Sequence, residues 1–293
     1  MAKEIDKKTE SIAHDSIVHM RNSLIQHGKW NDRIYLMHLG TTDVPEIIDD
    51  ILKLGRQNSY GKIFAKIPAS AGQAFQNAGF CVEARIPRGL INGEDLLFVS
   101  LFCKKARAVH RDAAQCQEVL NGLQDSSNNQ PIPLLPNGWK METLGPQDAS
   151  DMAHIYSEVF LSYPFPIDSP SYIREIMAEK SGVFFGIRDA ERNLVALSSS
   201  EINTLLSIAE MTDFATLPYI RGRHCAGNLL SVMEHDAVAH GVVTAFTIAR
   251  ASSASMNRVF ARAGYQYGGT LKQNTNIGGD LEDMNVWYRY LNN

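Results

Sequence analysis

The sequence predicts an α/β (α+β) fold with a mixed central sheet flanked by helices, preceded by a smaller α/β domain. Three observations support this prediction: helical and strand patterns alternate, a polar proline-containing stretch divides the chain, and a six-residue pattern recurs on both sides of it. The 293 residues suffice for two domains. We expect an N-terminal extension at 1–31, a first domain at 32–120, a linker at 121–136 and a second domain at 137–293.

The second domain supplies most of the predicted elements. Helical spacing of apolar residues predicts helices over 148–160, 171–179, 228–240 and 253–263. β-rich runs predict strands over 183–188, 194–203, 210–217 and 244–249, with Pro218 ending the third. The chain is expected to close with a β-hairpin that pairs 265–270 with 284–291.

The recurring pattern is Phe75-Gln-Asn-Ala-Gly79-Phe80, which returns as Phe260-Ala-Arg-Ala-Gly264-Tyr265. Each copy follows a helix and a short strand and precedes a strand pair. We infer that residues 32–106 are a degenerate half-copy of the second domain; the alternative is an unrelated α/β module. The first domain lacks a phosphate loop, so we expect it to cover the substrate side or to mediate a homodimer.

Composition limits the partners. Hydrophobic residues make up 44% of the chain, but no run of about 18 apolar residues predicts a membrane helix, and the polar N-terminus lacks a signal peptide. A cytoplasmic protein without a membrane partner is therefore expected. Basic residues are dispersed, which argues against nucleic acid, and the net charge of −4 suits a small cationic substrate. The four cysteines form no C-x-x-C pair, so no metal site is predicted.

The strongest functional signal lies between residues 209 and 230. A strand, Pro218 and a basic turn, Arg221-Gly222-Arg223-His224-Cys225-Ala226, lead into an amphipathic helix. Such a turn directs backbone N–H groups at one point beside the positive end of a helix dipole, and that point binds phosphate. Arg221 and Arg223 add charge suited to a pyrophosphate. The alternative is an ordinary strand–turn–helix connection.

This segment resembles motif A of the GNAT superfamily of N-acetyltransferases, whose loop reads Arg/Gln-x-x-Gly-x-Gly/Ala. His224 stands in place of the middle glycine, which puts a positive φ there in doubt. The resemblance implies a GNAT fold and acetyl-CoA as co-substrate. It assigns pantetheine contacts to Phe214, Ala215 and Thr216, pyrophosphate contacts to Gly222, Arg223, His224, Cys225, Ala226, Gly227 and Asn228, and a second cofactor contact to Asn257.

Further stretches are similar to the β-lysine N6-acetyltransferase family. They are SYPFPI (162–167), EMTDFATLP (210–218), TIARASS (247–253), GYQYGGTL (264–271), NTNIGG (274–279) and MNVWY (284–288). The resemblance implies acetylation of the side-chain amine of β-lysine to make the osmolyte Nε-acetyl-β-lysine. The alternatives are another amine, such as a polyamine, an aminoglycoside or a peptide terminus, and a non-catalytic acetyl-CoA-binding regulator.

Acetylating such an amine requires a base, because an amine with a pKa of ~10.4 arrives protonated. Glu210 occupies the position of a catalytic or water-positioning acid in many GNAT members. Asp213 would lie on the opposite face of a regular strand, but a bulge would bring it beside Glu210. Glu201 is a third acid, suited to binding the substrate ammonium.

A general acid for the leaving thiolate is less evident. Many GNAT members carry a tyrosine four residues before the glycine of the Gly-Phe/Tyr pair, and Phe260 stands there in this chain. Tyr265 is the substitute that we expect, with Tyr267 as an alternative. The remaining substrate contacts are assigned to Tyr163 and Phe165 along the aliphatic chain, and to Arg250, Asn274 and Asn285 at the carboxylate.

Overall fold

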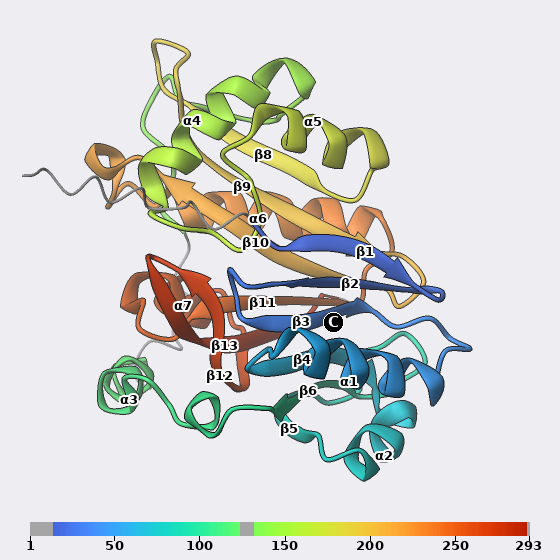
Figure 1. Ribbon diagram of the computed structural model, residues 1–293. Coiled ribbons are helices and arrows are strands. Elements are labelled where there is room, and N and C mark those ends of the chain that lie inside the picture. Colours follow the sequence, from blue (N-terminus) through green and yellow to red (C-terminus); the bar gives the residue numbers. More distant parts are fainter. Residues whose placement is uncertain (1–13, 124–131, 292–293) are drawn as a thin grey trace, which may run out of the picture.

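The structure is a computed structural model that describes residues 14–123 and 132–291. Most of the predicted linker, residues 124–131, lies outside the described residues. The described residues form one mixed sheet of 13 strands with helices packed on it, so the predicted mixed α/β fold is confirmed (Figure 1). Among them, no helix is long and apolar enough to span a membrane.

The strands are β1 Ser16–Met20, β2 Ser23–Gly28, β3 Arg33–His38, β4 Lys62–Pro68, β5 Cys81–Ile86, β6 Leu96–Phe102, β7 Lys140–Thr143, β8 Val183–Arg188, β9 Leu194–Asn203, β10 Ile208–Thr216, β11 Thr244–Arg250, β12 Gln266–Ile277 and β13 Asp280–Tyr290. The helices are α1 Glu46–Asn58, α2 Ala69–Asn77, α3 Ala113–Asn121, α4 Ala149–Val159, α5 Pro170–Glu179, α6 Cys225–Ala239 and α7 Ala254–Arg262.

Two elements differ from the prediction. Residues 16–28, assigned to an extension, form β1 and β2 at one edge of the sheet. The closing hairpin is longer than expected, because β12 continues past a register shift between Leu271 and Thr275. The polar run between these two residues breaks the alternation that marks a strand, and Gln273 there has a φ of 39°.

The sheet repeats its order on both sides of the contact between β5 and β12. Outward from this seam, one side runs β5, β6, β4, β3, β2 and the other β12, β13, β11, β10, β9. β3 and β4 are parallel, as are β10 and β11. The next pair toward the seam is antiparallel in both halves: β4 with β6, and β11 with β13. The seam pairs Gly269 with Ala84; Gly269 has a φ of 139°, and a Cβ there would lie 2.7 Å from the Ala84 Cα.

The recurring six-residue pattern ends a helix in the same way in both halves. The amide of Phe80 donates to the carbonyl of Phe75 at 3.1 Å, and that of Tyr265 donates to Phe260 at 3.0 Å. Gly79 supplies a φ of 91° and Gly264 a φ of 81°, the left-handed geometry that glycine provides at a helix C-terminus. The two aromatic rings pack on each other in both copies.

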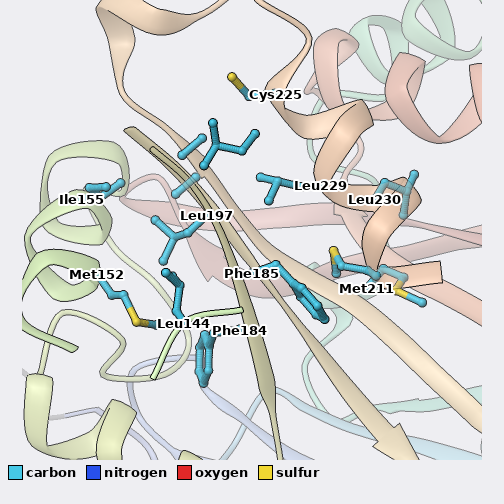
Figure 2. Close-up of a cluster of buried hydrophobic side chains, with 14 of the residues drawn as sticks. Leu144, Met152, Ile155, Phe184, Phe185, Leu197, Met211, Cys225, Leu229 and Leu230 are labelled. Atoms are coloured by element: carbon cyan, nitrogen blue, oxygen red, sulfur yellow. The ribbon is translucent and has the colours of Figure 1, made fainter. Parts of the chain in front are cut away.

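Each half has its own apolar core, and a third cluster joins them. In the second half, side chains of α4 and α6 pack on β8, β9 and β10, with Met152, Leu197 and Leu229 among them (Figure 2). The joining cluster lies between the halves and includes Phe98 of β6 and Phe246 of β11, whose ring centroids are 5.8 Å apart. The first half therefore packs directly against the strands that carry the predicted site.

Candidate active site

The strands β10 and β11 separate at the predicted site. Their parallel pairing covers only three positions and ends at Glu210 and Phe246, although β10 continues to Thr216 and β11 to Arg250. Beyond that point the two strands line a cavity of about 800 Å³. Since β9 still pairs with the other edge of β10, the edge that faces β11 is left for a ligand with amide groups.

A β-bulge brings two of the predicted acids into this cavity. Thr212 lies opposite Ser199 and Ala215 opposite Leu197, so β10 has one more residue than β9 over this interval. Asp213 in the bulge has a φ of 56°. Glu210 and Asp213 consequently both line the cavity, as the expected bulge required.

The three acids of the cavity, Glu201, Glu210 and Asp213, have different partners. Glu210 forms an ion pair with Lys66 of β4 at 3.0 Å. Asp213 accepts hydrogen bonds from the hydroxyls of Thr212, Tyr163 and Ser199. Glu201 makes no side-chain hydrogen bond or ion pair with any residue that the structure describes.

Burial dominates the electrostatics of this acid cluster. Burial, then the Glu210 and Asp213 carboxylates, raises the pKa of Glu201 to about 8, although Lys66 opposes them. Burial also raises the pKa of Asp213 against its three hydrogen bonds. Burial disfavours the charge of Lys66, but Glu210, Tyr35 and Glu201 outweigh it and raise the Lys66 pKa. A carboxyl group that titrates near neutrality suits proton transfer from an amine.

The predicted phosphate loop lines another part of the same cavity. After a short 3₁₀ turn, Gly222 has a φ of 84° and His224 a φ of 61°, and α6 begins at Cys225. His224 thus keeps the left-handed geometry despite replacing the glycine. The first amides of α6 lack intrahelical partners and suit a pyrophosphate.

The structure distributes the predicted cofactor residues as follows. Cavity-lining residues are Phe214, Thr216, Arg221, Gly222, Arg223, His224, Cys225, Ala226 and Gly227. The side chain of Ala215 is buried in the second-half core. The Asn228 amide donates to the carbonyls of His224 and Pro133, so it ties the segment that enters the second half to the loop.

Besides Ala215 and Asn228, three further predicted site residues, Asn257, Asn285 and Tyr265, do not line the cavity. Asn257 is fully buried, donates to the Arg250 and Ser253 carbonyls, and accepts from Asn285 and Trp287. This network occupies every donor and acceptor of the Asn257 side chain, and Asn285 contacts Asn257 and Thr270, so we expect neither side chain to contact a ligand. Tyr265 packs in the second-half core, where burial and Glu234 raise its pKa.

The other predicted substrate residues do line the cavity, namely Glu201, Tyr163, Phe165, Arg250 and Asn274. Arg250 is already paired with Glu282 at 3.3 Å. The loop that carries Tyr163 is fixed by the first half, since the Trp30 indole donates to the Tyr163 carbonyl and the Gln26 amide to the Pro164 carbonyl.

Several cavity residues were missed because they belong to the first half. Arg33 and Tyr35 of β3 and Phe64 of β4 line the cavity, and Lys66 reaches Glu210. The available signal was strand alternation: these residues share the face opposite to the apolar residues that pack under α1 and α2. A strand face that combines basic and aromatic side chains is more typical of the lining of a binding site than of a surface exposed to solvent.

Comparisons with known proteins agree with this geometry. The β-lysine N6-acetyltransferase of Methanococcus maripaludis is 34% identical over 275 residues, which cover 94% of this chain and 98% of that protein. The N-acetyltransferase YodP of Bacillus subtilis is 28% identical over 92% of this chain and 96% of its own length. The β-lysine N6-acetyltransferase of Methanosarcina mazei is 34% identical over 54% of this chain and 57% of its own length. No family model matches the chain.

Among solved structures, a spermidine N-acetyltransferase from Vibrio cholerae aligns with 53% of this chain and 95% of its own, with 15% identity and a TM-score of 0.46. The full-length relative carries the assignment, because the similarity extends over both halves of the sheet. The chain belongs to the β-lysine N6-acetyltransferase family, and it is an N-acetyltransferase, an enzyme that transfers an acetyl group to an amine.

Proposed function

We propose that this enzyme transfers the acetyl group of acetyl-CoA to the N6 amine of β-lysine and so forms the compatible solute Nε-acetyl-β-lysine. The observation that carries the proposal is the gap between β10 and β11, which connects the phosphate loop to the acid cluster in one cavity. The full-length similarity to a β-lysine N6-acetyltransferase supports the choice of substrate.

Acetyl-CoA fits this gap in one direction. Its pyrophosphate would lie against the α6 amides, with Arg221 and Arg223 supplying charge. Its pantetheine amides would pair with the free edge of β10 near Phe214 and Thr216. The thioester would then lie beside the bulge, where a backbone amide of residues 214–216 would stabilise the oxyanion.

In the reaction, the substrate ammonium loses a proton to the acid cluster, directly or through water. The neutral amine attacks the thioester carbonyl, a C–N bond forms, the C–S bond breaks, and coenzyme A leaves as a thiolate. The second proton of the nitrogen passes to the thiolate or to solvent, which gives the neutral amide. Phe260 lines the cavity at the position where many GNAT members carry a tyrosine, so the thiolate leaves without a tyrosine donor there. This is acceptable because a thiol has a pKa of ~8.5 and its anion is a tolerable leaving group.

The first half serves as a wall rather than as a second cofactor site. The repeated strand order supports its origin as a degenerate half-copy of the catalytic domain. The loop between β3 and α1 contains Asp43, whose carboxylate accepts hydrogen bonds from Asn22 and Ser23, where a phosphate loop would need cations. Homodimer formation and a cytoplasmic location stay predictions.

The test is release of free thiol from acetyl-CoA with a panel of amines: β-lysine, α-lysine, spermidine, an aminoglycoside and a peptide. We expect β-lysine to give the highest kcat/KM and Glu210→Gln to lower kcat by about 10²–10⁴, the range for a lost acid–base group. Preference for a polyamine, aminoglycoside or peptide would contradict the substrate, and acetyl-CoA binding without turnover on any amine would indicate a regulator.

A further inference from the structure

Arg33 is a buried cation without an anionic partner among the described residues. It is 3% exposed. The other buried cations of the first half each have an acid: Lys62 pairs with Glu83 at 2.7 Å and Arg107 with Asp32 at 3.1 Å. Buried charges in proteins are normally paired, because an unpaired charge loses its hydration without compensation. Arg33 is therefore an exception that requires an explanation.

The neighbours of Arg33 hold it in place without neutralising it. One terminal nitrogen donates to the carbonyl of Asn274 and to the hydroxyl of Thr275, and the other donates to the side-chain oxygen of Gln26 at 3.3 Å. The guanidinium carbon lies 5.1 Å from the ring centroid of Tyr35. Burial lowers the pKa of Arg33 to about 10, and Tyr35, Asp15 and Glu210 offset only part of the lost hydration.

The separation between Arg33 and the acid cluster suits the length of an amino-acid substrate. Arg33 and Tyr35 line the same cavity as Glu210 and Glu201. In the parallel register of β3 and β4, Arg33 lies opposite Lys62, four residues along β4 from Lys66, which contacts Glu210. Four residues span ~13 Å along a strand. Side chains that reach inward from both ends leave room between them for a short aliphatic chain.

We propose that Arg33 binds the carboxylate of the acceptor substrate, so that the non-catalytic half of the chain selects amines that carry a carboxylate at their far end. The inference rests on the proposed function and adds a recognition residue to it. The substrate carboxylate supplies the missing anion, while its N6 ammonium lies at the acid cluster. A guanidinium already fixed by three neutral acceptors loses little side-chain entropy on binding.

The test combines a variant with substrates that lack one group. The substrates are β-lysine, 6-aminohexanoate, which keeps the carboxylate, and 1,4-diaminopentane, which is β-lysine without its carboxylate. We expect Arg33→Met to lower kcat/KM by about 10- to 100-fold for the two carboxylates, the range for a lost charge-assisted hydrogen bond, and by less than about threefold for the diamine. Arg33→Lys keeps the charge without the planar fork, so an intermediate loss is expected.

Arg107→Met is the matched control. Arg107 is as buried as Arg33 and donates to the carbonyl of Gln273, the neighbour of Asn274, but it is paired with Asp32 and does not line the cavity. Arg107→Met should change kcat/KM by the same factor for all three substrates. The inference would be overturned if Arg33→Met lowered kcat/KM equally for the three substrates. It would also be overturned if the native enzyme had the same kcat/KM for the diamine as for β-lysine.

The two proposals fail separately. If β-lysine is not acetylated but 6-aminohexanoate is, and only the native Arg33 supports it, the proposed substrate is wrong and the carboxylate site stands. If no amine is acetylated, the carboxylate site is judged by thermal shift: β-lysine should raise the Tm of the native protein and not that of Arg33→Met. An equal shift in both proteins would contradict it.

Discussion

Glu201 and Glu210 lie directly opposite each other across the antiparallel strands β9 and β10. Side chains at paired positions share a face of the sheet, and like charges placed there destabilise it. The structure limits this repulsion in two ways: Lys66 neutralises Glu210, and Glu201 holds its proton to a higher pH than an ordinary glutamate. The two acids are therefore chemically distinct despite their symmetric placement.

Stability should fall with rising pH because of Glu201. Its pKa is raised from 4.5 to about 8 in the fold, so the folded state binds more protons than the unfolded state between these values. Stability then decreases as pH rises through this window. Glu201→Gln cannot ionise, so its Tm should exceed that of the native enzyme increasingly from about pH 5 to about pH 9. The exposed Glu191→Gln should leave the native pH profile unchanged; a Glu201→Gln profile parallel to the native one would show that Glu201 does not titrate there.

Removal of Lys66 should destabilise the fold through Glu210. Lys66→Met leaves the Glu210 carboxylate partly buried beside Glu201 without its cation. Breaking a buried pair from one side costs up to about 3–5 kcal/mol. The double variant Lys66→Met with Glu210→Gln should recover part of this loss, and a double-mutant cycle in urea should give a coupling of about 1–3 kcal/mol. Strictly additive losses would mean that the ion pair contributes nothing to stability.

Glycine at position 224 should be tolerated or stabilising. His224 has a φ of 61°, which costs a non-glycine residue about 1–2 kcal/mol, whereas glycine adds about 0.5–1 kcal/mol of unfolded-state entropy. His224→Gly should thus gain up to about 1 kcal/mol, and His224→Val should lose stability because a β-branched residue resists this geometry. The exposed His235→Gly within α6 should lose about 1 kcal/mol. Urea denaturation measures all three, and a loss in His224→Gly as large as in His235→Gly would contradict the role of φ.

Asn257 should matter for stability and not for the cofactor. Asn257→Ala leaves the Trp287 indole and the Asn285 amide without a buried acceptor, while the Arg250 and Ser253 carbonyls keep only their backbone donors. Each such group costs about 1–3 kcal/mol, so a large loss in the free energy of unfolding is expected with the KM for acetyl-CoA unchanged. Substitution of the exposed Arg221 by Met should instead raise the KM for acetyl-CoA about tenfold and leave the free energy of unfolding unchanged. A raised KM in a folded Asn257→Ala would restore Asn257 as a cofactor contact.

Local patterns predicted most elements of the second half and the turn before α6, because each depends on residues close in sequence. The bulge on β10 was only a condition for placing Asp213 beside Glu210, and no local pattern predicted it. The contributions of Arg33, Tyr35 and Lys66 depend on packing between strands far apart in the chain, and no local pattern encodes that contact. Asn257 illustrates a second difficulty. A buried amide that satisfies its own neighbours has the same sequence signature as one that awaits a ligand.

The seam at Gly269 determines what can be removed from this enzyme. A chain that began at residue 137 would leave β12 as an open sheet edge and expose the apolar face around Phe246 to water. Unpaired edges and contiguous apolar surface promote aggregation between copies. The second half resembles a complete acetyltransferase in its sequence patterns, yet we expect it to aggregate when it is produced alone, and it would lack the carboxylate site that we propose at Arg33.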